Sequence, residues 1–357
     1  MIESFKISNF KCFRELELPR LTRLTVIGGR NGVGKTALLE ALFMFFDRLN
    51  PNVTIGQYAR RGVPAVPLTT DSVFAPIFPY FDMSAPVRLS ARISGVAEDL
   101  LASYNPAFRP ASVVGQETQP GNGVVVVPTS GTSGPVASLD LSYTSSAGRQ
   151  DDAHLLLQPK AVALAVDRVM ADMPRAVIVG TGSPDPNLVS QRYGEMDVSG
   201  THDRLIEPLR AVEPRLKGLS SVQVGNASLM HADVGMGRKL PVAFLSEGFS
   251  RLLSILVFIG TCRGGLVLVD EIENGVHHSA ARSVWGGLAA AVREFDCQLV
   301  VTTHSYACIE SAAEGVAGEF AEDLSYVRLE RREGAIIANT YDRETLDAAI
   351  AHGLEVR

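Results

Sequence analysis

The sequence predicts an α/β fold with a mixed or parallel central sheet, on three observations. Short, largely apolar runs at 24–27, 265–269 and 298–302 are typical of parallel strands that are covered on both faces. Residues 279–295, between the last two runs, fit a crossover helix. A glycine-rich loop at 29–36 separates the first run from a helical pattern, so a strand, a tight turn and a helix follow one another.

The N-terminal region predicts antiparallel strands ahead of this core. Residues 5–13 alternate apolar and polar side chains as a half-buried strand does, and a second short strand is expected at 16–18. Apolar residues at helical spacing predict a helix over 36–49. Residues 51–85 are irregular and rich in Pro and aromatic residues, and the alternation at 87–93 predicts an edge strand.

The middle of the chain has little regular pattern. Residues 109–137 are dominated by Gly, Ser, Thr, Pro and Val, which predicts a long exposed loop or a small hairpin around 124–127. Helices are predicted at 158–170 and at 203–212. No heptad repeat runs through this part, so we expect no long coiled-coil arm.

Regular pattern returns near the C-terminus. A buried helix is predicted at 248–260, a hairpin from strands at 326–330 and 335–341, and a last helix from Glu344.

One domain is expected over the whole chain, 1–357. Within it, residues 1–95 and 236–357 would form one lobe. Residues 96–235 would form an inserted helical and irregular lobe, with a flexible loop at about 109–137.

Composition excludes several classes of protein. The chain has 357 residues, of which 46% are hydrophobic and 20% charged, as in ordinary soluble proteins. A net charge of −6 gives no global electrostatic signal for nucleic acid. The four cysteines have no metal-site spacing and indicate free thiols in a reducing cytosol. With neither a signal peptide nor a run long enough to span a bilayer, we expect a cytoplasmic protein without a membrane anchor.

The glycine-rich loop matches the pattern G-x-x-x-x-G-K-[ST] in full. Its glycines let backbone N–H groups turn inward around phosphates, Lys35 can reach the outer phosphates, and the Thr36 hydroxyl can bind Mg²⁺. The helix that follows would point its N-terminus at the anion. The expected nucleotide-binding residues here are Gly29, Arg30, Asn31, Gly32, Val33, Gly34, Lys35 and Thr36. The sequence therefore predicts binding of a nucleoside triphosphate.

Two acids follow the apolar run at 265–269. In α/β folds, ligands bind at the carboxyl ends of the strands. Asp270 would hold Mg²⁺, usually through water, and Glu271 would orient or deprotonate the attacking water. Alone, such a pair could be a solvated strand end. The glycine loop strengthens the functional interpretation.

Two further motifs point to the same edge of the sheet. His304 closely follows the run at 298–302. A single histidine is more often structural, but at the tip of this strand, next to the acidic pair, it can contact a γ-phosphate, and we favour that role. Ser246 and Gly248 open the helix at 248–260, where a hydroxyl and backbone N–H groups can meet an anion. Ser246 could equally be an ordinary helix N-cap, and both roles are compatible.

Taken in order, these motifs resemble those of the ABC-type ATPases: glycine loop, Leu-Ser-x-Gly before a helix, Asp-Glu after a strand, and His after a strand. The start at 7–13 resembles the RecF, SMC and OLD-like branch. The resemblance implies a P-loop NTPase head in which two copies clamp ATP and Mg²⁺. It covers residues 1–50 and 240–310.

The resemblance also implies roles for single residues. Ser246, Glu247 and Gly248 of one copy would face the γ-phosphate that Lys35 of the other copy holds. Glu271 would be the catalytic base, His304 the switch histidine and Lys35 a third catalytic group. The segment 273–275 would lie at the dimer interface.

The sequence departs from the family pattern in places. The signature carries Glu247 and Phe249 where transporters carry glycine and glutamine. Gln57 is a candidate for the glutamine of the Q-loop by position only, and a polar loop residue is the alternative. Lys11 is expected near the nucleotide base or ribose. The pair 277–278, two histidines, has no third metal ligand at a sensible spacing, which favours a solvated turn.

The resemblance implies an ATPase that forms an ATP-dependent homodimer, or a higher oligomer, and drives a separate effector such as a nuclease or Toprim protein in anti-phage defence or DNA transactions. A slow nucleotide-dependent sensor or scaffold is the second hypothesis, and a transporter subunit a weaker third. DNA stays an open partner that net charge does not support. Four arginines are expected to be solvated or paired rather than a DNA track: Arg60, Arg61, Arg88 and Arg92.

Overall fold

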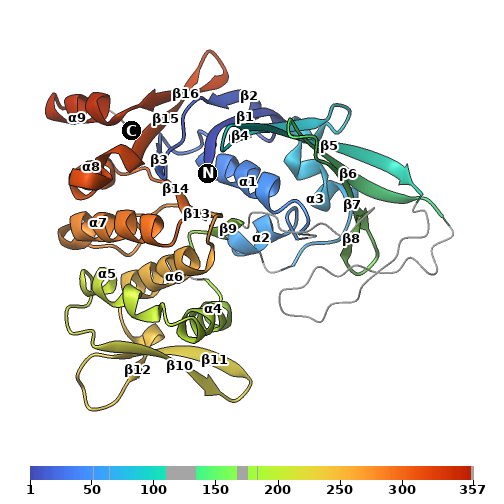
Figure 1. Cartoon of the computed structure of the whole chain (residues 1–357). Helices are drawn as coiled ribbons and strands as arrows, with labels where there is room; N and C mark the ends of the chain where they lie inside the picture. The colour runs from blue at the N-terminus through green and yellow to red at the C-terminus, as the bar shows by residue number, and fades with distance from the viewer. Residues whose placement is uncertain (51, 64, 110–133, 167–175, 183, 355–357) are drawn as a thin grey trace.

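Helix α1 (Lys35–Phe46) lies between two β-sheets, and this arrangement organises the molecule (Figure 1). The structure is a computed structural model that describes residues 1–357 except 51, 64, 110–133, 167–175, 183 and 355–357. All residues of α1 except Thr36 are buried, as expected for a helix that is apolar on all sides. Phe45 on this helix meets Phe5 of the N-terminal strand edge to face, with ring centroids 5.8 Å apart.

The central sheet carries the predicted parallel strands and confirms the mixed α/β fold. Its strand order is β16-β15-β3-β14-β13-β9, and only the pairing of β16 with β15 is antiparallel. The strands are β3 (Leu24–Gly28), β9 (Ala176–Val179), β13 (Leu266–Val269), β14 (Gln298–Thr302), β15 (Leu324–Arg332) and β16 (Ala335–Tyr341). The short strand β9 is an addition that the sequence analysis did not predict.

Both faces of this sheet are covered, which explains its continuous apolar runs. Val267 and Val269 of β13 belong to one buried cluster with α6 (Glu247–Thr261) and α7 (His278–Glu294). Leu266 and Leu268, which alternate with them, belong to a second cluster with α1 and the other sheet. The carboxyl ends of β3, β13 and β14 therefore lie at one edge between two packed layers.

The second sheet is antiparallel throughout and follows the order β2-β1-β4-β5-β6-β7-β8. Its strands are β1 (Ile2–Phe10), β2 (Phe13–Leu18), β4 (Val87–Ile93), β5 (Val96–Phe108), β6 (Val136–Ser145), β7 (Gln150–Leu157) and β8 (Val162–Val166). The N-terminal antiparallel strands are thus as predicted.

Two sequence predictions about this sheet were wrong. The strand at 87–93 is not an edge strand, because β4 pairs with β1 on one side and β5 on the other. Alternation reports which face is buried and carries no information about the strand's neighbours. The helix predicted from residue 158 is also wrong, since residues 162–166 form a strand that pairs with β7. A short apolar run fits a strand and a buried helix equally well.

A third, smaller sheet of order β10-β11-β12 packs with two helices below α6 in Figure 1. Its elements are β10 (Gly218–Val224), β11 (Ala227–Asp233), β12 (Leu240–Pro241), α4 (Pro186–Val198) and α5 (Ile206–Arg210). Where a helix was predicted at 203–212, a 3₁₀ turn at 202–205 leads into α5.

Strands from the predicted insert at 96–235 occur in all three sheets, so the insert holds more strand than expected. The division into lobes stays a prediction. The expected hairpin at 124–127 and most of the loop at 109–137 lie outside the described residues.

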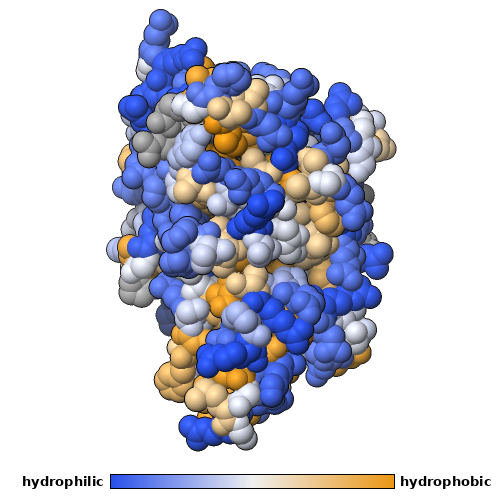
Figure 2. All heavy atoms as spheres, turned by 90° about the vertical axis from the view of Figure 1, so that its left-hand side faces the viewer, coloured by the Kyte–Doolittle hydropathy of each residue, from blue (hydrophilic) through white to orange (hydrophobic). Residues whose placement is uncertain are grey.

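The remaining helices are α2 (Gly56–Arg60), α3 (Thr70–Val73), α8 (Tyr306–Gly315) and α9 (Arg343–Ala351). Figure 2 shows the left-hand side of Figure 1, where hydrophilic and apolar side chains are interspersed. No helix in the described part of the chain combines the length and apolar character that crossing a bilayer requires.

Candidate functional site

The glycine loop forms a tight turn between the buried strand β3 and helix α1. Gly29, Gly32 and Gly34 adopt φ of 141°, 77° and 92°, in the region that side chains disfavour. Space is also short. A Cβ on Gly29 would lie 2.5 Å from the carbonyl oxygen of Leu329, and one on Gly34 would lie 2.7 Å from Cys12 Sγ. Two of these glycines are therefore required by backbone conformation and by packing together.

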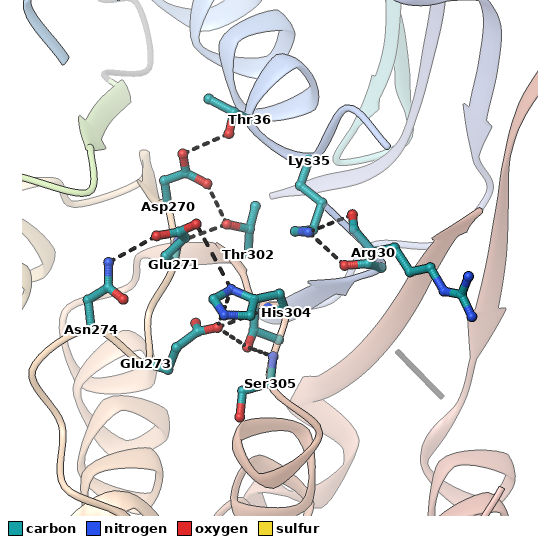
Figure 3. Close-up of polar contacts among 12 residues, drawn as sticks. Arg30, Lys35, Thr36, Asp270, Glu271, Glu273, Asn274, Thr302, His304 and Ser305 are labelled. Atoms are coloured by element: carbon teal, nitrogen blue, oxygen red, sulfur yellow. Dashed lines mark hydrogen bonds and ion pairs between the residues drawn. The ribbon is translucent and has the colours of Figure 1, made fainter. Parts of the chain in front are cut away.

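Lys35 begins α1, and its side chain turns back over the loop (Figure 3). Its Nζ donates to the carbonyl oxygens of Gly29 at 2.6 Å and Arg30 at 3.0 Å. Burial lowers the pKa of Lys35, while Asp270 and two glutamates act in the opposite direction. The ammonium group thus lies inside the loop, at a place where it can meet phosphate oxygens.

Asp270 directly follows β13, and two hydroxyl groups hold its carboxylate. Thr36 Oγ1 donates to Oδ2 at 2.8 Å, and Thr302 Oγ1 donates to Oδ1 at 2.5 Å. The Asp270 residue is only 7% exposed. The sequence predicted Thr36 and Asp270 as the metal residues, and the fold brings their oxygens into contact.

This pair of oxygens fits a magnesium ion. Mg²⁺ prefers oxygen ligands and keeps several waters, so one hydroxyl and one carboxylate suffice when phosphates complete the shell. Within the described ranges, no group of three or more His, Cys, Asp or Glu residues could hold a metal ion. A site that binds through an all-protein cage is therefore not found there, and the Thr36–Asp270 pair is the candidate.

Glu271 has a left-handed backbone conformation, with φ of 49°. This backbone geometry costs conformational free energy in a residue other than glycine, and residues strained in this way cluster at functional sites. Its backbone N–H donates to Thr302 Oγ1 at 2.9 Å, and its Oε2 accepts from Asn274 Nδ2 at 3.0 Å. The turn directs the Glu271 carboxylate toward His304, whose Nδ1 is 3.9 Å from Oε1.

His304 follows β14, as predicted, and lies between two carboxylates (Figure 3). The nearer one is Glu273, whose Oε1 lies 3.1 Å from His304 Nδ1. The same oxygen accepts from the His304 backbone N–H at 2.9 Å and from Thr303 Oγ1 at 2.8 Å. Glu273 was expected at a dimer interface, and in the structure its carboxylate binds the histidine of its own chain.

The signature residues lie at the start of α6. Ser246 is its N-cap and accepts from the backbone N–H of Phe249 at 3.1 Å, so the ordinary capping role is present. Ser246 and Glu247 are exposed, whereas Gly248 is buried against the backbone of Gly275. Among the residues described, no hydrogen bond or ion pair connects residues 246–248 with the loop at 29–36.

Lys11 is part of an internal charge cluster. Its Nζ donates to Glu40 Oε2 and to Gln57 Oε1, both at 2.5 Å. Burial lowers its pKa, and the neighbouring Glu40 acts in the opposite direction. Arg61 Nη1 also donates to Glu40, at 2.6 Å, and Arg60 lies 3.9 Å from the same carboxylate.

This cluster shows where several sequence candidates lie. Gln57 is buried, and its side-chain oxygen accepts a hydrogen bond from Lys11. The contact of Lys11 with a nucleotide stays a prediction. The expectation that Arg60 and Arg61 are paired within the chain agrees with these contacts. Arg92 donates to the carbonyl oxygen of Gly95, and Arg88 is exposed. His277 caps α7 through Nδ1.

Comparison with protein families shows the family to which the chain belongs. A family model described as "AAA domain, putative AbiEii toxin, Type IV TA system" matches residues 67–310, and one described as "AAA ATPase domain" matches residues 1–80. The chain belongs to the AAA ATPase family. This agrees with the resemblance that the motifs suggested.

Individual relatives of this AAA ATPase are distant. It is 21% identical over 375 aligned positions to an "ATP/GTP phosphatase" of Helicobacter pylori, an alignment that covers 97% of each chain. Among solved structures it is similar to an SMC head bound to the C-winged helix domain of ScpA, with a TM-score of 0.49, 14% identity and coverage of 98% and 99% of the two chains. An SMC head of Pyrococcus furiosus with an extended coiled coil gives a TM-score of 0.49 and 11% identity, covering 99% of each.

Sequence reasoning missed one cation beside the candidate site. Arg251 of α6 is 4% exposed, and its guanidinium donates to the carbonyl oxygens of Asp270 and Glu271. It also donates to the carbonyl oxygens of Gly180 at 2.9 Å and Thr181 at 3.2 Å. Arg251 lies five residues after Ser246 in the sequence. No local pattern indicated that its side chain would contact the residues that follow β13.

Proposed function

We propose that this AAA ATPase hydrolyses ATP at a site completed by a second copy of the chain. The convergence of Thr36, Asp270, Glu271 and His304 beside the glycine loop carries the proposal. Phosphoryl transfer needs little covalent chemistry from the protein. Catalysis depends on charged groups that position the reactants and stabilise the charge of the transition state, and this site holds such groups.

Each group has a role that its position supports. The loop N–H groups and Lys35 would bind the phosphates, and Thr36 with Asp270 would hold Mg²⁺, which neutralises developing charge on the phosphate oxygens. Glu271 would accept a proton from the attacking water, since its side chain is 36% exposed whereas Asp270 is buried. His304, with a side chain 45% exposed, would contact the terminal phosphate.

A second copy is proposed because the signature residues are free to meet it. Ser246 and Glu247 are exposed at the start of α6, where backbone N–H groups favour an anion. Their own chain offers them no contact with the glycine loop in the described residues. ATP held by one copy would therefore be capped by the signature of the other, so that ATP and dimerisation depend on each other. We propose that the dimer drives a separate effector protein, in defence against phage or in DNA transactions.

The substitution Glu271→Gln tests this proposal. Turnover of ATP is expected to fall at least about 100-fold, because the amide cannot accept the proton of the attacking water. Affinity for ATP should be retained, and light scattering should show more dimer with ATP than for the unmodified chain. Glu314→Gln, at an exposed position on α8, is the matched control and should change neither quantity. Undiminished hydrolysis by Glu271→Gln would contradict the assignment of the base.

A slow sensor is the second candidate function, and one contact favours it. Asn274 Nδ2 already occupies Glu271 Oε2 at 3.0 Å, so the base is partly engaged. Removing the amide in Asn274→Ala should speed hydrolysis if this contact restrains the base. Fast basal turnover of the unmodified chain, with or without duplex DNA, would count against the sensor.

A further inference from the structure

One carboxylate oxygen of Glu273, Oε1, accepts two hydrogen bonds and also lies in ion-pair contact with the His304 ring. Thr303 Oγ1, the backbone N–H of His304 and His304 Nδ1 lie 2.8, 2.9 and 3.1 Å from Oε1. All three contacts come from two consecutive residues that directly follow β14. The carboxylate therefore fixes the backbone that leaves the strand and also the ring that the strand presents (Figure 3).

The environment of Glu273 differs from that of the groups it serves. Its side chain is 17% exposed, against 45% for that of His304, so the glutamate lies behind the histidine as seen from solvent. Its other oxygen, Oε2, is buried and accepts no hydrogen bond in the structure. A buried polar atom without a partner costs folding free energy, and an apolar residue would avoid that cost. The geometry is thus better explained by the ring it orients than by stability.

A carboxylate at Nδ1 has a defined effect on an imidazole. The two ring nitrogens are not equivalent, and the groups that surround each nitrogen decide which of them carries the proton. A negative charge beside one nitrogen favours the tautomer whose N–H faces that charge. Oε1 of Glu273 lies 3.1 Å from Nδ1 and Oε1 of Glu271 lies 3.9 Å from it, so the charge of both carboxylates favours the tautomer with the proton on Nδ1. Nε2 is then the nitrogen left for a further ligand.

We infer that Glu273 is a positioning residue for His304: it holds the proton on Nδ1, fixes the plane of the ring and so directs Nε2 to the terminal phosphate. This inference rests on the proposed ATPase function for its consequence, but the structural part can be tested without turnover. Glu273 itself touches neither the glycine loop nor Asp270 among the contacts described.

The first test is the tautomer of His304. Nitrogen NMR of the full chain labelled with ¹⁵N-histidine reports which ring nitrogen is protonated, and His304→Asn identifies the signal. The proton should be on Nδ1 in the unmodified chain and in Glu273→Gln, whose amide oxygen still accepts. In Glu273→Ala the ring should populate the other tautomer. A ring of Glu273→Ala that keeps its proton on Nδ1 would overturn the inference.

The second test is kinetic. Glu273→Ala should lower kcat about 10–100-fold, the usual effect of losing a partner that orients a functional histidine, with ATP affinity within about threefold. Glu273→Gln should restore kcat to within about fivefold of the unmodified chain. In a His304→Ala background, Glu273→Ala should have no further effect, because residues that act as a unit are not additive.

The ATPase function and the positioning role of Glu273 can fail independently of each other. Glu213→Ala, with a side chain 16% exposed and an arginine partner, matches the burial of Glu273 away from the site. A purely structural role would instead lower ATP affinity and the unfolding temperature together, and would persist in the His304→Ala background. If the unmodified chain does not hydrolyse ATP, the proposed function fails, and the tautomer still decides the role of Glu273.

Discussion

Gly248 and Gly275 touch through their backbones: a Cβ on Gly248 would lie 1.7 Å from the carbonyl oxygen of Gly275. In turn, a Cβ on Gly275 would lie 2.9 Å from Gly248 Cα. The first turn of α6 therefore rests on the segment that follows Glu271. The glycine of the signature motif has a reason to be glycine inside a single chain, before any partner is considered.

Replacing Gly248 by alanine should destabilise the protein. Alanine in a helix normally stabilises it by up to about 1 kcal/mol relative to glycine. Here the methyl group meets backbone that cannot rotate away, so we expect a net loss of about 1–3 kcal/mol in the free energy of unfolding. Gly194→Ala in α4 is the matched control, because nothing lies within 4 Å of its Cβ. Urea unfolding of both variants decides, and a Gly248→Ala as stable as the unmodified chain would contradict the contact.

Replacing Thr36 by valine should affect stability and turnover separately. Asp270 would keep only the Thr302 hydroxyl, and a buried acceptor that loses a donor costs about 1–3 kcal/mol. Turnover of ATP at a fixed Mg²⁺ concentration should fall at least about tenfold, or ~1.4 kcal/mol of activation free energy. Thr36→Ser keeps the hydroxyl and should recover most of both. If Thr36→Val and Thr36→Ser turned over ATP equally fast, the hydroxyl would not be a metal ligand.

Asp47 predicts a dependence of stability on pH. Burial raises the pKa of Asp47 to about 6 from 3.8, opposed by the hydrogen bond from Asn50. The folded state then binds more protons than the unfolded state between these values, so this group's contribution falls as pH rises from about 4 to 6 and is constant above. The substitution Asp47→Asn should raise the free energy of unfolding by up to about 3 kcal/mol at pH 7.5 and by little at pH 4.5.

Urea unfolding at these two pH values measures the difference. Asp82→Asn, at an exposed aspartate, should show no such gain at pH 7.5. An equal effect of Asp47→Asn at both pH values would show that the carboxyl does not titrate between them.

Much of the site follows from local sequence signals. The glycine loop, the Asp-Glu pair and the strand-terminal histidine each depend on a short apolar run, and parallel strands that are buried on both faces are apolar throughout. Once three such strands are parallel neighbours, their carboxyl ends must share an edge. The proximity of Thr36 to Asp270 and of Glu271 to His304 is therefore a consequence of topology.

The remainder depends on tertiary contacts that short patterns do not encode. The run at 162–166 became a strand because β7 lies beside it, and the four residues of β9 are too few for a periodic signal. No local pattern gave Arg251 a role, and the resemblance placed Glu273 at a dimer interface. Only the packing of α6 and of the loop before α7 brings these two side chains to the site.

Strand β3, which leads into the glycine loop, is synthesised early, but the strands that pair with it are synthesised late. Residues 24–28 have β14 and β15 as neighbours, and these comprise residues 298–302 and 324–332. At synthesis rates of about 5–20 residues per second, tens of seconds separate the strand from both partners on the ribosome. The hairpins of the antiparallel sheet can form within that interval, since their partners are close in sequence. The nascent chain can thus form the antiparallel sheet first, and the strand that leads into the glycine loop gains both neighbours only after residues 298–332 have been made.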